Sequence, residues 1–200
     1  MGDPPERVDS LVLATRNPHK LREFGRLLAP AGIAVEPLPD QVTLPSEDGD
    51  TFLDNALPKA RAAAAATGRP AIADDSGIES DALGGRPGVR SARFAGEHAT
   101  DQQNLDKLLA EAPAGSGLRY VCAVAYVDPG TQEEHVFLGD SRGILAESPR
   151  GSGGFGYDPA FLPDEYGHAR TMAELTDDEK DRISHRGRAL GAFVRWLRVR

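Results

Sequence analysis

Two adjacent carboxylates, Asp74 and Asp75, follow the apolar run at residues 71–73 (AIA) and precede Ser76 and Gly77. The run predicts a buried strand over residues 71–74, with the pair at its carboxyl end. Like charges there repel each other and are costly to desolvate unless a cation offsets them. Ligands of open α/β sheets bind beyond such strand ends, and carboxylates without zinc-type ligands suit Mg²⁺ shared with substrate phosphates. The alternative for the same residues is a turn capped by an Asp side chain.

A phosphate-binding loop is predicted near the N-terminus. The apolar run 11–14 predicts a strand, and leucines and a phenylalanine at helical spacing follow from residue 21 onwards. Asn17 suits the N-cap of that helix, and Pro18 suits its first position. The helix start is expected to offer free amides and a positive dipole end, where the cation of Lys20 is unfavourable unless an anion binds. This favours an anion site over a solvated surface lysine.

The glycine-rich segment 151–156 (GSGGFG) matches the G-x-G-x-x-G dinucleotide pattern, but its surroundings argue against that function. The pattern requires a strand before it and a helix after it, whereas Pro149 precedes it here and Asp158–Pro159 follows. A flexible surface loop is the simplest alternative. Phe155 and Tyr157 are unfavourable on a solvated loop unless something stacks on them, so we expect the loop to face a ligand.

Composition and charge narrow the class of protein. The chain has 200 residues, of which 40% are hydrophobic and 27% charged, with a net charge of −8. The acidic balance disfavours nucleic acid polymers as partners, but it permits a small anion held by local lysines and arginines. Cys122 is the only cysteine, which excludes an intramolecular disulfide. No apolar run approaches membrane-spanning length, so we expect no membrane partner and a cytoplasmic location.

The order of the predicted elements mixes βα units with a β-hairpin, which predicts an α/β fold with a mixed sheet. Residues 1–10 are polar and are expected to form a frayed or disordered tail, followed by a single catalytic domain over residues 11–200. Capping boxes predict helices that begin after Thr51, with Asp54, and after Thr100, with Gln103, and the first is expected to continue to Thr67 and Gly68. Helices are also expected to begin after Thr176, with Glu179, and after Ser184. Strands are expected over residues 11–14, 33–38, 71–74, 119–127 and 134–138.

Six motifs occur in chain order: TRNPHK, EDGDTFLDNALPKA, IADDSG, ALGGRPGVRSARFAG, GGFGYDPAF and AELTDDEKDRISHRG. With them the chain resembles, over residues 11–196, the non-canonical purine nucleoside triphosphate pyrophosphatase family, of the RdgB or inosine-triphosphatase type. The resemblance implies Mg²⁺-dependent hydrolysis of dITP, ITP and XTP to the monophosphate and pyrophosphate, which clears deaminated purines from the nucleotide pool. It also implies an elongated mixed sheet flanked by helices, two lobes with an active-site cleft between them, and a homodimer.

The motif positions carry implied roles. By resemblance, Asn17 and Lys20 contact phosphate oxygens, and Lys59 reaches the same phosphates. Glu47 and Asp75 are implied ligands of Mg²⁺, and Asp75 also matches the acceptor of the proton from the attacking water. Since a metal-bound carboxylate oxygen is a poor base, either the second oxygen takes the proton or the metal lowers the pKa of the water enough. The sequence leaves both open.

The resemblance further implies that Phe155 stacks on the base. Donors from His185 or Arg186 would pair with the 6-keto oxygen of inosine and xanthine and reject the amino group of adenine. The implied phosphate-loop residues are Thr15, Arg16, Asn17, Pro18, His19 and Lys20. The other implied substrate contacts are Ser76, Phe155, Gly156, Tyr157, Asp158, Lys180, His185 and Arg186.

Two positions depart from the family pattern. Arg16 stands where glycine is common and adds a cation beside the phosphates, and Ser46 stands where some members have a second acidic residue. The number of metal ligands and the ranking of ITP, dITP and XTP stay open. A Maf-like pyrophosphatase for pyrimidine or modified bases is the competing enzyme, against which the SHR and GFGYD segments argue. A nucleotide sensor without hydrolysis is the other alternative, which an intact Asp75 and Lys20 disfavour.

Overall fold

The structure is a computed structural model and describes residues 8–199, so most of the tail predicted over residues 1–10 lies outside the described residues. It confirms the α/β class with a mixed sheet. The strands are β1 (Ser10–Leu13), β2 (Ala34–Pro37), β3 (Ala71–Ser80), β4 (Gly117–Asp128), β5 (Glu133–Leu145) and β6 (Phe161–Pro163). The α-helices are α1 (Pro18–Leu28), α2 (Phe52–Thr67), α3 (Asp101–Glu111), α4 (Asp177–Ile183) and α5 (His185–Leu197).

One six-stranded sheet runs in the order β2-β1-β3-β4-β5-β6. β1 pairs in parallel with both β2 and β3, whereas β6 pairs with β5 in the antiparallel direction. β1 lies between two strands, and its apolar residues Leu11, Val12 and Leu13 are accordingly buried. No helix within residues 8–199 combines the length and the apolar character needed to span a membrane.

Contacts divide the described chain into two compact units. Unit 1 contains residues 8–75, 123–138 and 189–199, and unit 2 contains residues 76–122 and 139–188. β3, β4, β5 and α5 each pass from one unit to the other, so neither unit is encoded by one continuous stretch of sequence. The single catalytic domain over residues 11–200 stays a prediction.

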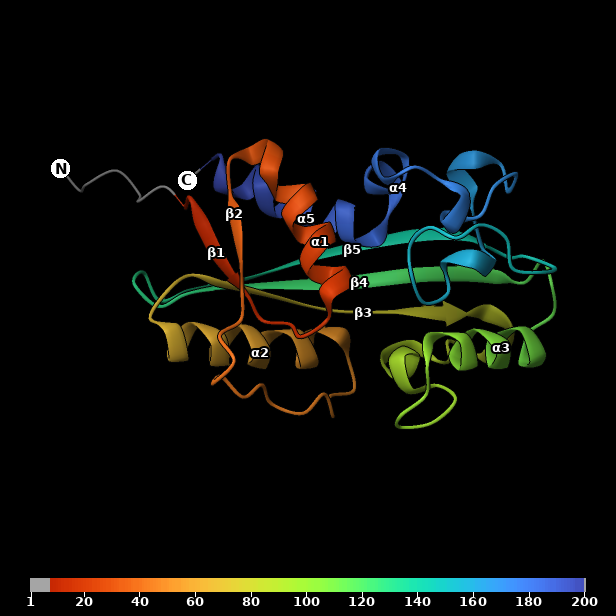
Figure 1. The fold of residues 1–200 in the computed structure, drawn as a ribbon, viewed down its shortest axis with the longest axis horizontal. Coiled ribbons are helices and arrows are strands. Elements are labelled where there is room, and N and C mark those ends of the chain that lie inside the picture. The colour runs from red at the N-terminus through yellow and green to blue at the C-terminus, as the bar shows by residue number, and fades with distance from the viewer. Residues whose placement is uncertain (1–7, 200) are drawn as a thin grey trace. The chain divides into compact units, whose positions relative to one another are not determined.

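In unit 1, α2 lies on one face of the sheet and α1 on the other (Figure 1). α2 begins at the predicted capping box, in which the Thr51 hydroxyl accepts from the Asp54 amide and the Asp54 carboxylate accepts from the Thr51 amide. Gly68 ends the helix in the left-handed conformation, as predicted for a helix terminus. Small buried side chains let the helix approach the sheet closely, namely Ala56, Ala60, Ala63 and Ala64.

In unit 2, an apolar core forms between the sheet and the helices and loops around it. α3 begins at the second predicted capping box, formed by Thr100 and Gln103, and places Leu105 and Leu108 in that core. The short helix α4 also begins at a capping box, formed by Thr176 and Glu179. Aromatic and aliphatic side chains of the sheet and loops fill the rest, including Ile78, Tyr120, Tyr157, Phe161 and Met172.

The length of β3 corrects the sequence prediction. The strand runs from Ala71 to Ser80, so Asp74 and Asp75 lie in its middle and not at its carboxyl end. The segment DSG favours a turn by residue type, but Ile78 and Ser80 are buried beyond it and continue the strand. Both carboxylates are therefore held inside a sheet, with only 1% and 6% of their residue surfaces exposed.

Replacing the N-cap of α2 tests how the start of this helix is fixed. We expect Thr51→Ala to lower the free energy of unfolding by about 1 kcal/mol, because one amide loses its capping acceptor. In a protein of this size that corresponds to a decrease in Tm of about 2–4 °C, measured by circular dichroism. Thr43→Ala, at an exposed position outside helices and strands, is the control and should leave Tm within about 1 °C. An unchanged Tm in Thr51→Ala would contradict this account of the helix start.

Candidate active site

The predicted phosphate loop is built on the start of α1. Asn17 is the N-cap, as predicted, and its side-chain oxygen accepts from the amides of His19 (2.8 Å) and Lys20 (3.4 Å). Pro18 has no amide hydrogen. The amides of the first turn are therefore already capped, which corrects the expectation that they are free for an anion. What the helix start retains is its positive dipole end and the Lys20 ammonium.

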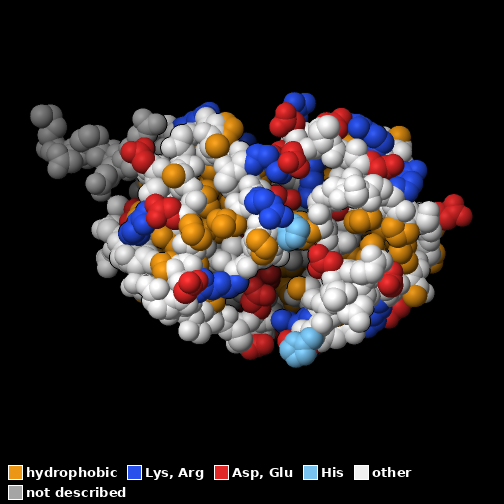
Figure 2. Space-filling view, in the orientation of Figure 1, with side chains coloured by type: hydrophobic (Ala, Val, Ile, Leu, Met, Phe, Trp, Pro, Cys, Tyr) orange, Lys and Arg blue, Asp and Glu red, His pale blue; other side chains and the backbone are white. Residues whose placement is uncertain are grey.

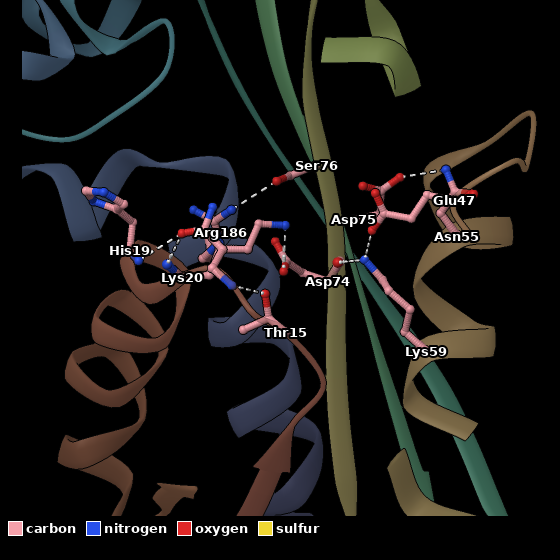
Figure 3. Close-up of polar contacts among 11 residues, drawn as sticks. Thr15, His19, Lys20, Glu47, Asn55, Lys59, Asp74, Asp75, Ser76 and Arg186 are labelled. Carbon is pink, nitrogen blue, oxygen red and sulfur yellow. Dashed lines mark hydrogen bonds and ion pairs between the residues drawn. The ribbon is translucent and has the colours of Figure 1, made fainter. Parts of the chain in front are cut away.

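Lys20 contacts one of the two buried carboxylates. Its Nζ lies 2.9 Å from Oδ1 of Asp74, a residue with no exposed side-chain surface (Figure 3). The cation in the first helical turn is thus stabilised by a carboxylate of β3, which offsets its unfavourable position at the helix start. This contact joins the phosphate loop directly to the middle of β3.

Arg16 makes contacts that the sequence did not predict. Its guanidinium donates to the carbonyl oxygens of Leu38 (2.7 Å), Pro39 (2.8 Å), Asp40 (3.2 Å) and Val42 (2.9 Å). These bonds fasten the segment after β2 to the loop before α1. The structure thus gives this side chain a fastening role, and its implied place in the phosphate loop stays a prediction.

A polar cluster surrounds Asp75 (Figure 3). The Asn55 amide donates to Asp75 Oδ2 over 2.9 Å, and the Asn55 side-chain oxygen accepts from the amide of Gly49 over 2.8 Å. Lys59 donates to the carbonyl oxygen of Asp74 over 2.7 Å and forms an ion pair with Glu47. The start of α2 therefore brings the segment that contains Glu47 to the carboxylates of β3.

Gly49 makes the close approach of that segment possible. A Cβ atom at this position would lie 2.5 Å from Cβ of Asp54 and 2.8 Å from Oδ1 of Asn55, both shorter than van der Waals contact. Only a glycine lets the loop lie directly over the first turn of α2. The motif EDGDTFLDNALPKA thus encodes a loop and a helix start that fit together and hold Glu47 near Lys59.

Burial raises the pKa of the Asp75 carboxyl above its ordinary value, although Lys59, the Asn55 amide and Lys20 act in the opposite direction. Repulsion from Glu47 adds to the increase. A carboxylate with a raised pKa has a greater affinity for a proton than an exposed one, and its charge is stabilised less than in water. Asp75 is therefore suited to accept a proton and to gain from a nearby cation.

In unit 2, the glycine-rich loop folds around the carboxylate of Asp158. Oδ2 accepts from Lys180 Nζ (2.8 Å) and from the Phe155 amide (2.9 Å), and Oδ1 accepts from the Tyr120 hydroxyl (3.1 Å). A Cβ at Gly154 would lie 2.0 Å from Oδ2, and this residue has a φ of +70°. The loop is held at several points, so the alternative of a flexible surface loop does not describe it.

Two cations lie near the ring of Phe155. Lys180 Nζ lies 5.3 Å and Arg186 Cζ lies 5.8 Å from the ring centroid. Arg186 also donates to the Ser76 hydroxyl over 2.9 Å (Figure 3). Lys180 and Arg186 are almost fully buried, whereas Phe155 is partly exposed. This arrangement offers an aromatic face and nitrogen donors to a planar ligand that carries acceptor oxygens.

Comparison with known families and proteins shows what the chain is similar to. Residues 11–196 match the model of the Ham1 family. The chain belongs to the Ham1 family. It is 52% identical over 191 residues to a dITP/XTP pyrophosphatase of Symbiobacterium thermophilum, with 94% of each chain covered. It is 50% identical over 199 residues to a dITP/XTP pyrophosphatase of Frankia alni, with 94% of this chain and 96% of the relative covered.

Solved structures agree with this assignment. The Ham1 protein from Coxiella burnetii matches with a TM-score of 0.83 at 40% identity, covering 96% of this chain and 99% of that one. A nucleoside-triphosphatase / dITP/XTP pyrophosphatase from Mycobacterium abscessus matches with a TM-score of 0.69 at 45% identity, covering 92% and 98%. The family and the fold class predicted from the six motifs are both confirmed.

In this Ham1-family chain the predicted site residues form two groups. The group in unit 1 consists of Thr15, Arg16, Asn17, Pro18, His19, Lys20, Glu47, Lys59 and Asp75. The group in unit 2 consists of Ser76, Phe155, Gly156, Tyr157, Asp158, Lys180, His185 and Arg186. Asp75 and Ser76 are consecutive residues of β3, so one strand connects the two groups.

Two residues of the second group, Tyr157 and His185, make contacts with buried residues of unit 2. Tyr157, predicted in the base pocket, is buried in the apolar core and donates its hydroxyl to the carbonyl oxygen of Ser91 over 2.8 Å. Burial raises the pKa of this hydroxyl well above its ordinary value, so it stays a donor. The ring of His185 stacks on Tyr120, with centroids 4.6 Å apart and an interplanar angle of 7°.

Asn55 and Tyr120 were missed by the sequence analysis. Asn55 lies four residues before Lys59 on α2, so both face β3, and this spacing was a usable signal. No pattern in the sequence around Tyr120 indicates a role in the site. It contacts Asp158 and His185 only because β4 brings it beside them.

Arg16→Lys tests the fastening role of this guanidinium. Lysine keeps the charge but cannot span several carbonyl groups, so we expect a loss of about 1 kcal/mol and a Tm lower by about 2–4 °C. Arg22→Lys, at an exposed position on α1, is the matched control and should change Tm by less than about 1 °C. If Arg16→Lys kept the Tm and changed only phosphate affinity, the side chain would have the role first predicted.

Asp75→Asn should stabilise the free protein at neutral pH. Because the folded pKa of Asp75 lies above the unfolded value, its ionised form opposes folding once the pH exceeds that folded pKa. Asparagine removes this charge, and we expect a rise in Tm of about 2–4 °C at pH 7, an effect on the order of 1 kcal/mol. The difference should shrink as the pH falls through the raised pKa towards the ordinary carboxyl range.

The measurement is thermal denaturation of both proteins across that pH range, without nucleotide. Asp48→Asn is the control, since this carboxylate lies in the same segment as Glu47 but is exposed. A lower Tm for Asp75→Asn at pH 7 would show that Lys59 and Asn55 stabilise the carboxylate more than burial destabilises it.

Proposed function

We propose that this chain hydrolyses dITP, ITP and XTP to the nucleoside monophosphate and pyrophosphate, and so removes deaminated purines from the nucleotide pool. The observation that carries the proposal is the cluster in unit 1, where the buried carboxylates of Asp74 and Asp75 lie beside Lys20 and Lys59. The names of the relatives in the Ham1 family support the substrate class. ITP, dITP and XTP share the 6-keto group that the cations beside Phe155 suit.

The triphosphate would be held by the two lysines. The chain carries a net charge of −8, so a polyanionic substrate requires local cations that outweigh the general repulsion. Figure 2 shows acidic and basic side chains interspersed on the face that it presents. Lys20 stands at the positive end of the α1 dipole, and Lys59 projects from α2. Both ammonium groups are suited to phosphate oxygens as point charges.

Mg²⁺ is the proposed cofactor, held by Glu47 and Asp75. Both supply the oxygen ligands that this ion prefers, and the raised pKa of Asp75 marks a buried charge that a cation would stabilise. Within residues 8–199, no group of three or more His, Cys, Asp or Glu side chains could by itself hold a metal ion. This fits an ion bound by one or two carboxylates and completed by substrate phosphates. When bound, it would neutralise phosphate charge and acidify the attacking water.

Asp75 is the proposed acceptor of the proton from that water. Its raised pKa gives it a greater proton affinity than an exposed carboxylate has. The Asn55 amide holds Oδ2 from one side, which fixes the plane of the carboxylate. Asp74, by contrast, is bonded to Lys20 and offers its backbone carbonyl to Lys59, so its proposed role is to position the two lysines.

Base selection is assigned to Arg186 with Phe155. A guanidinium has donors and no acceptor, so it pairs with a 6-keto oxygen and leaves the amino group of adenine unpaired. Ser76 accepts from Arg186 and fixes its direction, and Asp158 accepts from Lys180 and fixes that side chain near the ring. The ring of Phe155 is the proposed stacking surface.

A panel of nucleoside triphosphates tests this function. Initial rates of pyrophosphate release from ITP, dITP, XTP, ATP, GTP and TTP would be measured with and without Mg²⁺. We expect kcat/KM for the 6-keto, 2-unaminated substrates to exceed that for ATP by at least about 10²-fold, and Asp75→Asn to retain about 1% of kcat or less. Preference for TTP would favour the Maf-like alternative. Tight binding without turnover would favour a nucleotide sensor.

Arg186→Ala should reduce the selectivity for ITP over ATP more than it weakens binding of the phosphates. Removing the guanidinium leaves the keto oxygen of inosine without its donor, while adenine loses an unfavourable neighbour. The ratio of kcat/KM for ITP to that for ATP should therefore fall by about 10-fold or more. Arg188→Ala, at an exposed position two residues away, is the control and should keep the ratio. An equal loss on both substrates would move the selecting role to His185.

We further propose that the enzyme acts as a homodimer in the cytoplasm. The resemblance to the pyrophosphatase family supports the dimer. The location follows from the proposed substrates, because free nucleoside triphosphates are found in the cytoplasm. Light scattering at micromolar concentration measures the mass of the assembly directly. A mass equal to that of one 21.3 kDa chain would contradict the dimer.

A further inference from the structure

The motif ALGGRPGVRSARFAG belongs to the family pattern, yet none of its residues has a role in the proposed site. In unit 2 it lies along β3 beyond the short pairing with β1, which reaches only residues 71 and 72. The Ser80 amide donates to the carbonyl oxygen of Arg86 over 3.1 Å, and Glu79 forms an isolated bridge with Pro87. The motif therefore covers backbone groups at this edge of β3, which would otherwise require other partners.

Ser91 is the most connected residue of this motif. It is buried, and its hydroxyl accepts from the Ile78 amide over 2.8 Å and donates to the carbonyl oxygen of Gly88 over 2.6 Å. Its own carbonyl oxygen accepts from the Tyr157 hydroxyl over 2.8 Å. Ser91 thus joins two segments that are 79 positions apart in the chain, residue 78 of β3 and residue 157 of the glycine-rich loop.

Side chains of helix α3 bind backbone groups of the motif just after Ser91. Asn104 donates to the carbonyl oxygen of Ala92 over 3.0 Å and accepts from the amide of Ala95 over 2.8 Å. Lys107 donates to the carbonyl oxygen of Phe94 over 2.8 Å. The backbone is thus held before Ser91, at residues 86 and 87, and after it, at residues 92–95. Ser91 therefore has little freedom to follow a displacement of the loop or the strand.

The two joined segments carry the two parts of the proposed base-binding surface. Ile78 lies two residues after Ser76, which accepts from Arg186, and Tyr157 lies two residues after Phe155. We infer that Ser91 and the Tyr157 hydroxyl are positioning residues that set the Phe155 ring relative to Ser76 and Arg186, and so determine recognition of the purine base. This inference rests on the proposed function and assigns base recognition, not phosphate binding, to the motif.

Tyr157→Phe removes the hydroxyl and keeps the buried ring. Tyr166→Phe is the matched control, because this ring packs at the edge of the same core and takes no part in the contacts of Ser91. The readouts are the inhibition constants of inosine monophosphate, which contains the base, and of pyrophosphate, which does not. We expect Tyr157→Phe to raise the constant for inosine monophosphate and the KM for ITP about 5- to 10-fold, with pyrophosphate unchanged within about 2-fold.

Ser91→Ala is the second variant. It removes the hydroxyl that accepts from the Ile78 amide but keeps the carbonyl oxygen that accepts from the Tyr157 hydroxyl. We therefore expect Ser91→Ala, like Tyr157→Phe, to raise the inhibition constant of inosine monophosphate. The double variant should cost less than the product of the two single effects, since both bonds act on one linkage. Equal increases for inosine monophosphate and pyrophosphate, or equal effects of Tyr166→Phe, would overturn the inference.

Hydrogen exchange separates this inference from the proposed function. In the free protein, Tyr157→Phe should accelerate exchange of amides in residues 151–158 about 5-fold or more, while peptides of α2 stay unchanged. If the wild-type protein released no pyrophosphate from ITP but exchange responded in this way, the proposed substrate would be wrong and the linkage correct. Unchanged exchange in residues 151–158 would overturn the linkage whatever the substrate.

Discussion

The burial of two adjacent carboxylates in the middle of β3 is the constraint on which the surrounding structure depends. Asp74 and Asp75 cannot lie there ionised without cations and donors that replace water. Lys20 supplies one cation from α1, and Lys59 supplies another from α2, with Asn55 as a donor beside it. The starts of both helices must therefore be fixed, which is the physical purpose of the Asn17 cap and of the capping box at Thr51.

A third buried carboxylate organises unit 2 in the same manner. Asp158 accepts from a lysine, a tyrosine and a backbone amide, and these bonds determine where the glycine-rich loop can lie. The glycines of the loop allow the backbone to approach the carboxylate, as Gly154 shows, and do not make the loop mobile. A partly exposed aromatic ring such as Phe155 can then be presented at low entropic cost to a ligand.

The sequence predicted the features whose causes are local. Capping boxes at Thr51, Thr100 and Thr176 place helix starts because the partner residue is three positions away. The extent of β3 was predicted wrongly, since residues that favour turns are overridden by burial and pairing within the sheet. The contacts of Arg16 and the role of Tyr120 depend on segments far apart in the chain, so no local pattern could reveal them.

The ion pairs of unit 1 explain why metal and triphosphate would have to bind together under the proposed function. Lys20 and Lys59 already form ion pairs with Asp74 and Glu47, so a triphosphate alone would compete with these carboxylates for the lysines and leave them less compensated. A cation alone would equally leave the lysines without their partners. With both bound, Lys20 would contact phosphate while it keeps Asp74, Lys59 would exchange Glu47 for phosphate, and the metal ion would replace Lys59 as the partner of Glu47, so each of these charges would keep a partner. Charge balance within the cluster thus favours the complete substrate complex over either component.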